Sequence, residues 1–86
     1  MKKQGNKEFV PLHADIPATL EKVLETAGSV SEFCRMWGLR YISFNRVLRG
    51  VQRFHPAPGS VYQTVLSELR RRRLLVETRT EEKQAA

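Results

Sequence analysis

The chain has 86 residues and a formal net charge of +6, with 15 Lys and Arg against 9 Asp and Glu. That length fits one small domain, and no apolar run approaches the roughly 20 residues that span a bilayer. One cysteine excludes a disulfide within the chain, and a single Cys with His13 and His55 cannot supply a four-ligand zinc site. We therefore expect no membrane segment, no metal and no cofactor.

Catalytic patterns are missing from the sequence as well. It holds no paired carboxylates, no nucleophile with a base at a recognisable spacing and no glycine-rich phosphate loop. The first residues also lack the apolar stretch of a signal peptide. These observations indicate a cytoplasmic binding protein and not an enzyme.

The chain begins with a polar and basic segment, residues 1–8, in which we expect a flexible arm. Arms of some DNA-binding domains wrap the duplex or enter its minor groove, which is the alternative to an idle tail. The folded domain is predicted over residues 9–79, and a flexible tail over residues 80–86.

The first helix is predicted over residues 16–27, between an N-cap at Asp15 and a stop at Gly28. Pro17 is tolerated in its first turn. Apolar residues recur at helical spacing: Leu20, Val23, Leu24 and Ala27. The solvent face is expected to hold Thr19, Glu21, Lys22 and Glu25.

Two short helices follow, joined by a tight turn. Ser29 and Glu32 form a capping box, which predicts a helix that begins at residue 30. Gly38 ends that helix, because glycine enters the left-handed conformation without steric cost. The next helix is predicted over residues 40–49, with Gly50 at its end. The expected inward-facing residues of the two helices are Phe33, Cys34, Trp37, Phe44, Val47 and Leu48.

This window, residues 29–50, resembles the helix-turn-helix of phage λ repressor and Cro-like regulators. Such motifs have a small residue in the first helix, glycine four residues later, an apolar residue directly after it, and two apolar residues three apart in the second helix. Those places hold Cys34, Gly38, Leu39, and the pair Phe44 and Val47. Cysteine stands where alanine is usual. The resemblance implies a phage- or plasmid-type transcriptional regulator, and most simply a repressor.

The charge pattern points in the same direction. No Asp or Glu occurs from residue 33 to residue 67, whereas five arginines do: Arg35, Arg40, Arg46, Arg49 and Arg53. An acid-free basic segment on such a motif is typical of a surface that faces phosphates. The residues predicted to read bases are Arg40, Tyr41, Ile42, Asn45 and Arg46, and those predicted to hold phosphates are Arg49, Gln52 and Arg53. Ile42 has two possible roles, contact with a thymine methyl group or simple packing.

A loop follows Gly50, because residues 51–60 contain two prolines and a glycine. We expect Val51 and Phe54 to return to the core. A paired-strand wing is the rival interpretation, but prolines remove donors that a strand ladder needs.

Ser60 is expected to open a last helix that extends to about residue 78. Its apolar face holds Val61, Tyr62, Val65, Leu66 and Leu69. Four arginines, residues 70–73, come next, followed by three apolar residues. The predicted dimer interface consists of Leu69, Leu74, Leu75 and Val76. Packing of the last three back on the first helix is the alternative.

Together these elements predict an all-α fold: a compact bundle of about four helices that contains a helix-turn-helix and a longer C-terminal helix. The predicted function is sequence-specific binding of double-stranded DNA as a homodimer on a palindromic site. The alternative is a small helical adaptor, or an accessory protein of plasmid partition or replication, that binds a protein partner through its C-terminal helix and DNA only non-specifically.

Overall fold

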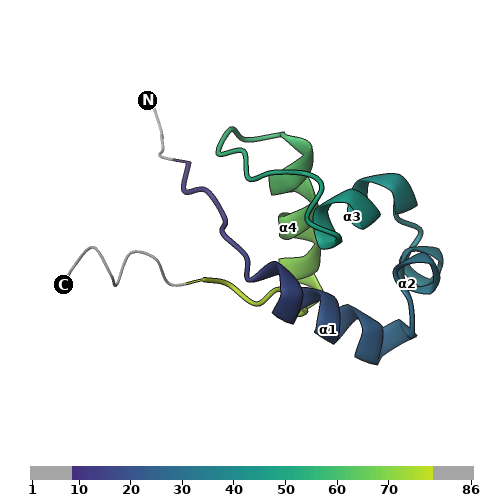
Figure 1. The fold of residues 1–86 in the computed structure, drawn as a ribbon. Helices are drawn as coiled ribbons and strands as arrows, with labels where there is room; N and C mark the ends of the chain where they lie inside the picture. The colour runs from purple at the N-terminus through teal and green to yellow at the C-terminus, as the bar shows by residue number, and fades with distance from the viewer. Residues whose placement is uncertain (1–8, 79–86) are drawn as a thin grey trace.

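The computed structural model describes residues 9–78, which form an all-α bundle of four helices (Figure 1). The helices are α1 (Ile16–Ala27), α2 (Val30–Trp37), α3 (Tyr41–Leu48) and α4 (Val61–Arg71). α3 packs against each of the other three helices, and α1 also packs against α2. The predicted fold class is confirmed. The predicted arm (1–8) and tail (80–86) lie outside the described residues.

Local capping signals explain where three of the helices begin. The side chains of Asp15, Ser29 and Ser60 accept hydrogen bonds from backbone N–H groups three residues later, at 3.2, 3.0 and 3.2 Å. The predicted capping box is formed only in part, because the Glu32 side chain pairs with Arg35. Each of these caps satisfies a donor that the first helical turn would otherwise leave unpaired.

The last helix is shorter than predicted. α4 ends at Arg71 and does not extend to residue 78. With 11 residues it exceeds α2 and α3, but not the 12 residues of α1. Arg73 adopts the left-handed conformation, with φ 63°, and the N–H of Leu74 donates to the carbonyl of Leu69 at 2.9 Å. This turn diverts the chain out of the helix.

Beyond that turn the chain runs alongside the segment that precedes α1. The N–H of Asp15 donates to the carbonyl of Val76 at 2.7 Å, and the N–H of Thr78 donates to the carbonyl of His13 at 3.2 Å. Ala14 and Glu77 thus form an isolated antiparallel bridge. The two ends of the described chain therefore leave the bundle on the same side (Figure 1).

One of the predicted dimer contacts at this end, Leu69, needs correction. Leu69 is fully buried within its own chain, so its side chain is not available to a second subunit. Leu74 and Leu75 are partly buried and pack against the core of the same chain. Val76 is half-buried and its carbonyl bonds to Asp15. The alternative, that this segment folds back toward the first helix, is the one the structure adopts.

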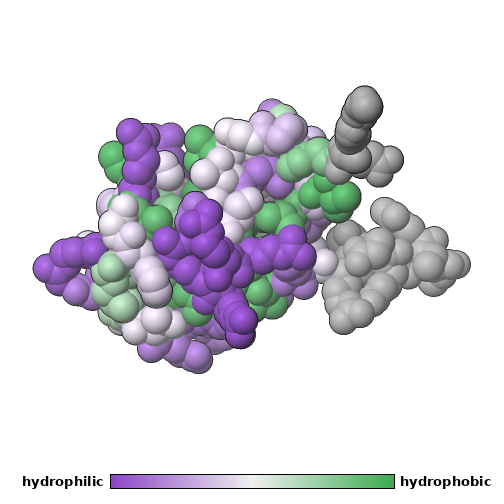
Figure 2. Space-filling model, turned by 180° about the vertical axis from the view of Figure 1, so that it is seen from behind, coloured by the Kyte–Doolittle hydropathy of each residue, from purple (hydrophilic) through white to green (hydrophobic). Residues whose placement is uncertain are grey.

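One hydrophobic core joins the four helices. Its fully buried side chains include Val23, Phe33, Leu48, Leu66 and Leu69. Cys34 is buried, as predicted, and burial raises the pKa of its thiol, which disfavours the reactive thiolate. On the face shown in Figure 2, hydrophilic side chains cover the centre and the apolar ones appear in separate small areas.

Several predictions of burial were wrong. Thr19 was expected in solvent but is fully buried, because its hydroxyl accepts the N–H of Val76 at 3.0 Å. Val51 and Phe54 were expected in the core but are 68% and 40% exposed. The Phe54 ring stacks on the His13 ring instead, with 4.3 Å between centroids. Leu24, expected on the apolar stripe, is also 40% exposed.

Candidate nucleic-acid interface

The turn between α2 and α3 has the geometry that its sequence predicts. Gly38 is left-handed, with φ 67°, and the N–H of Leu39 donates to the carbonyl of Cys34 at 2.8 Å. Leu39 is half-buried against the core. Only a residue that tolerates positive φ can make this reversal cheaply, so the glycine fixes how α3 leaves α2.

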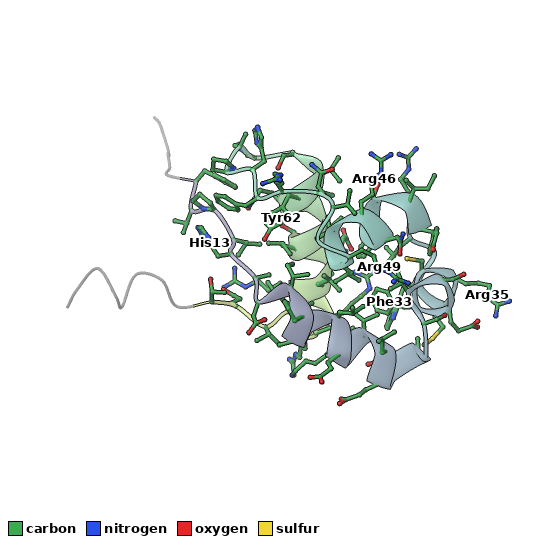
Figure 3. The ribbon with its side chains drawn as sticks, in the orientation of Figure 1. His13, Phe33, Arg35, Arg46, Arg49 and Tyr62 are labelled. Atoms are coloured by element: carbon green, nitrogen blue, oxygen red, sulfur yellow. The ribbon has the colours of Figure 1, made fainter. Side chains whose placement is uncertain are left out.

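α3 has one buried face and one exposed face. Phe44, Val47 and Leu48 are buried, with exposed fractions of 4% or less. Their outward counterparts on the helix are Ile42, Arg46 and Arg49. Figure 3 shows Arg46 extending from α3 away from the bundle, whereas Phe33 lies inside it. The buried face therefore anchors the helix and leaves a cationic ridge in solvent.

The five predicted base-reading residues all lie on α3 or at its start. Arg40 occupies the N-cap position, and Tyr41 and Ile42 form the first turn, with Tyr41 45% and Ile42 67% exposed. Arg46 is exposed and Asn45 is half-buried. An α-helix with its side chains is about 10–12 Å in diameter, which is the width that the major groove of B-form DNA, about 12 Å, can accept.

Asn45 and Arg49 are linked to each other, a contact that the sequence did not reveal. The Nε of Arg49 donates to the Oδ1 of Asn45 at 3.3 Å. An asparagine that reads adenine uses its carbonyl oxygen and its amide nitrogen together. In this structure Arg49 occupies the oxygen, so the two side chains act as a pair and Arg49 also orients Asn45.

Gln52 and Arg53, the other predicted phosphate contacts, lie in the loop after α3, which ends at Leu48. The backbone N–H of Gln52 donates to the carbonyl of Arg46 at 3.0 Å, which holds this residue against the end of the helix. Gln52 is half-buried and Arg53 is exposed. Further along the loop, Nδ1 of His55 accepts the N–H of Ala57 at 3.3 Å, so the loop has its own internal order.

The ion pairs separate two groups of arginines. Arg35 pairs with Glu32, Arg70 with Glu77, and both Arg71 and Arg72 with Glu68. Within residues 9–78, five arginines have no acidic partner: Arg40, Arg46, Arg49, Arg53 and Arg73. All of these except Arg73 lie on α3 or close to its ends. Most of the arginine charge that no carboxylate pairs with is therefore found around one helix.

The described residues contain neither a cluster of metal-ligand side chains nor a helix that could span a membrane. Among those residues there is no group of three or more His, Cys, Asp or Glu side chains that would hold a metal ion. None of the described helices is long and apolar enough to cross a bilayer. Guanidinium groups, an amide and a tyrosine hydroxyl remain, and these bind phosphates and base edges.

Comparison with protein-family models, with curated proteins and with solved structures finds no match to this chain.

Proposed function

We propose that the protein is a sequence-specific regulator that binds double-stranded DNA, with α2 and α3 as its helix-turn-helix and α3 as the helix that enters the major groove. The observation that carries the proposal is the set of four arginines without an acidic partner on and beside α3. A polyanion attracts such a group, and the outward face of α3 offers side chains suited to base edges. A function on DNA requires access to DNA, so a cytoplasmic location remains part of the proposal.

Each side chain has a role in this proposal. Arg46 contacts guanine, Asn45 contacts adenine once Arg49 releases its oxygen, and Ile42 meets a thymine methyl group. Arg40 and Tyr41 lie at the amino-terminal end of α3, which in such motifs is nearest the bases. Arg53 and Gln52 hold phosphates beside the groove, as does Arg49 in the complex.

Binding as a homodimer on a palindromic operator also remains part of the proposal, with repression as the expected outcome. One 8-residue helix reads few base pairs, so a two-fold pair of helices is the usual way to gain affinity. The contacts between subunits must come from residues other than Leu69, which is buried in its own chain.

The alternative function, an adaptor that binds a protein through its C-terminal helix, loses the feature that suggested it. That feature was the mixed arginine and leucine segment after Leu69. Leu74 and Leu75 pack on the core of their own chain, and three of the four arginines are paired with carboxylates. In the part of the chain that the structure describes, these leucines are therefore only partly exposed.

Selection from a pool of random double-stranded DNA tests the proposal, at low and at near-physiological salt. We expect a palindromic consensus that survives the higher salt, because base contacts persist when counterion release weakens the phosphate contacts. Enrichment without a consensus, lost as salt rises, would contradict sequence-specific binding. Sedimentation of the protein alone, well above the binding concentration, tests the homodimer separately.

Two variants test the assignment of the binding face. Asn45→Ala and Arg46→Ala should each reduce the preference for the consensus by about tenfold or more. They should leave the helical content unchanged, because both side chains point away from the core or lie at its edge. Retention of the same consensus at the same affinity by both variants would show that another face reads the DNA.

A further inference from the structure

The four consecutive arginines at the end of α4 have four different environments. The side chains of Arg70 and Arg71 are 61% and 70% exposed and each makes one ion pair, with Glu77 at 3.0 Å and with Glu68 at 3.2 Å. Arg73 lies in the left-handed turn after the helix. Arg72 differs from all of them, because its side chain is only 13% exposed. An arginine that is so largely withdrawn from water needs a structural reason.

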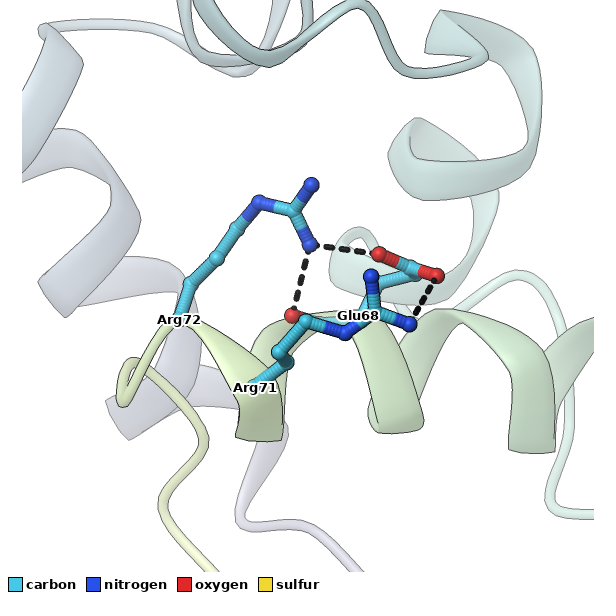
Figure 4. A network of polar contacts seen from close by, with 3 residues as sticks. All are labelled: Glu68, Arg71 and Arg72. Atoms are coloured by element: carbon cyan, nitrogen blue, oxygen red, sulfur yellow. Dashed lines mark hydrogen bonds and ion pairs between the residues drawn. The ribbon is translucent and has the colours of Figure 1, made fainter.

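Arg72 is held by two oxygens of a single residue, Glu68. Its Nη1 donates to the backbone carbonyl of Glu68 at 2.9 Å and to the Oε1 of the same residue at 2.5 Å (Figure 4). The other carboxylate oxygen of Glu68 pairs with Arg71. The Nε of Arg72 is buried without a hydrogen-bond partner. The guanidinium is therefore fixed on one edge and turned away from water on another.

The face of that guanidinium lies over an aromatic ring. The Cζ of Arg72 is 4.9 Å from the centroid of the Trp37 ring. Trp37 was expected on the inward face beside Phe33, but it is 46% exposed. A planar cation over an indole gains electrostatic energy from the ring, and the gain grows when the pair is partly shielded from water. Arg72 thus lies over an aromatic ring that the core does not bury.

Trp37 lies at a position where its contact with Arg72 can affect the orientation of α3. Trp37 is the last residue of α2, directly before the left-handed Gly38 that begins the turn to α3. α2 packs against α1 and α3, whereas α4 packs against α3. The Arg72 side chain thereby connects the end of α4 to the end of α2, at the point where the direction of α3 is set.

We propose that Arg72 is a positioning residue for the binding face: clamped by Glu68, it holds Trp37 and thereby fixes the turn that orients α3. This inference rests on the proposed function, since the face being oriented is the one that binds DNA. It gives one residue of the arginine run, Arg72, a structural role in orienting α3. It also explains why one of the four arginines is largely withdrawn from water although this leaves its Nε without a hydrogen-bond partner.

Arg71 supplies a matched control. Arg71→Met and Arg72→Met each remove one positive charge from adjacent residues, and each removes a partner of Glu68, but only Arg72 contacts Trp37. The two variants therefore lose the same long-range attraction for DNA. Any difference between the two variants in their preference for the selected site over a scrambled duplex therefore measures the effect of the contact between Arg72 and Trp37.

The experiment measures that preference for the wild type and both variants at a temperature at which all are folded by circular dichroism. We expect Arg72→Met to lose about tenfold more preference than Arg71→Met, the equivalent of one cation–π contact. Trp37 is the only tryptophan, so its fluorescence emission should shift in Arg72→Met and not in Arg71→Met. Arg72→Lys keeps the charge without the flat guanidinium, and should lose preference as Arg72→Met does.

Trp37→Leu keeps the inference testable if Arg72→Met does not fold, because it leaves the contacts between Arg72 and Glu68 in place. It should lower the preference to a similar extent. Equal preference of Arg71→Met and Arg72→Met, or an unchanged preference in Trp37→Leu, would overturn the positioning role while leaving the proposed function intact. A wild type that prefers no sequence would overturn both.

Discussion

The side-chain amide of Gln63 is hydrogen-bonded to both backbone polar groups of Leu12. Its Oε1 accepts the N–H of Leu12 at 2.9 Å, and its Nε2 donates to the Leu12 carbonyl at 3.1 Å. Gln63 is 3% exposed, so these bonds replace water that cannot reach the site. Gln63 of α4 thus pairs with the backbone of Leu12 in the way that a neighbouring strand would.

Gln63→Ala should therefore destabilise the protein. It leaves an N–H and a carbonyl in a region with little water, at a cost of about 2 kcal/mol in the free energy of unfolding. Urea denaturation followed by circular dichroism measures the change. Thr64→Ala, at the exposed neighbouring position, should change the free energy of unfolding by less than about 0.5 kcal/mol. Equal effects of the two substitutions would show that Gln63 does not hold this segment.

The ends of three helices have the same hydrogen-bond pattern, and only one lacks glycine. Gly38 and Gly50 have φ of 67° and 78°, and Arg73 has φ of 63°. The N–H of the next residue donates to a carbonyl five residues earlier, in the pairs Leu39–Cys34, Val51–Arg46 and Leu74–Leu69, at 2.8, 2.9 and 2.9 Å. A residue with a Cβ atom is sterically strained in this conformation.

Arg73→Gly should consequently stabilise the protein, because relief of that strain contributes about 1 kcal/mol to the free energy of unfolding. Glycine also gives the unfolded chain more conformational freedom, which offsets a part of this gain. Urea denaturation at neutral pH measures it. The comparison is Arg71→Gly, where glycine replaces a helical residue and should destabilise by about 0.5 kcal/mol. A loss of stability in Arg73→Gly would mean that the arginine side chain stabilises the turn by more than the strain costs.

The ion pairs of Glu68 with Arg71 and Arg72 make the stability of the protein depend on pH. The hydrogen bond from Arg72, and then the charges of Arg71 and Arg72, hold the pKa of this carboxyl below its usual value of 4.5. A lowered carboxyl pKa contributes stability that is complete above 4.5 and is lost as the pH falls through the lower folded-state value. Glu68→Gln should be less stable than the wild type at about pH 6, and this deficit should shrink at about pH 3. A deficit that stays constant between these pH values would contradict the ion pair as its source.

Short-range signals predicted much of the fold correctly. The caps at Asp15, Ser29 and Ser60 act within three residues of the helices they begin, and a glycine turn such as that at Gly38 depends on its own backbone. These features are encoded locally, so the sequence displays them directly. The order of the four helices and the exposed face of α3 followed from the same kind of evidence.

The features that the sequence did not reveal depend on partners far along the chain. Thr19 is polar but buried, because its hydroxyl bonds to the N–H of Val76, 57 positions away. Gln63 reaches across 51 positions to Leu12. The end of α4 was also misplaced, because an arginine at positive φ leaves no signal and the following apolar residues continue a helical pattern. The Asn45–Arg49 contact depends on the rotamers of two side chains, which spacing alone does not determine.

The most direct measurement compares the wild type, Arg46→Ala and Arg70→Ala for binding to the selected site and to a scrambled duplex of the same length. Each variant removes one positive charge, but Arg46 lies on the outward face of α3 and Arg70 is paired with Glu77 on α4. We expect the wild type to prefer the selected site by at least about 1,000-fold. Arg46→Ala should reduce that preference by about tenfold or more, and Arg70→Ala should leave it unchanged. No preference in the wild type, or equal losses in the two variants, would contradict the reading of DNA sequence by α3.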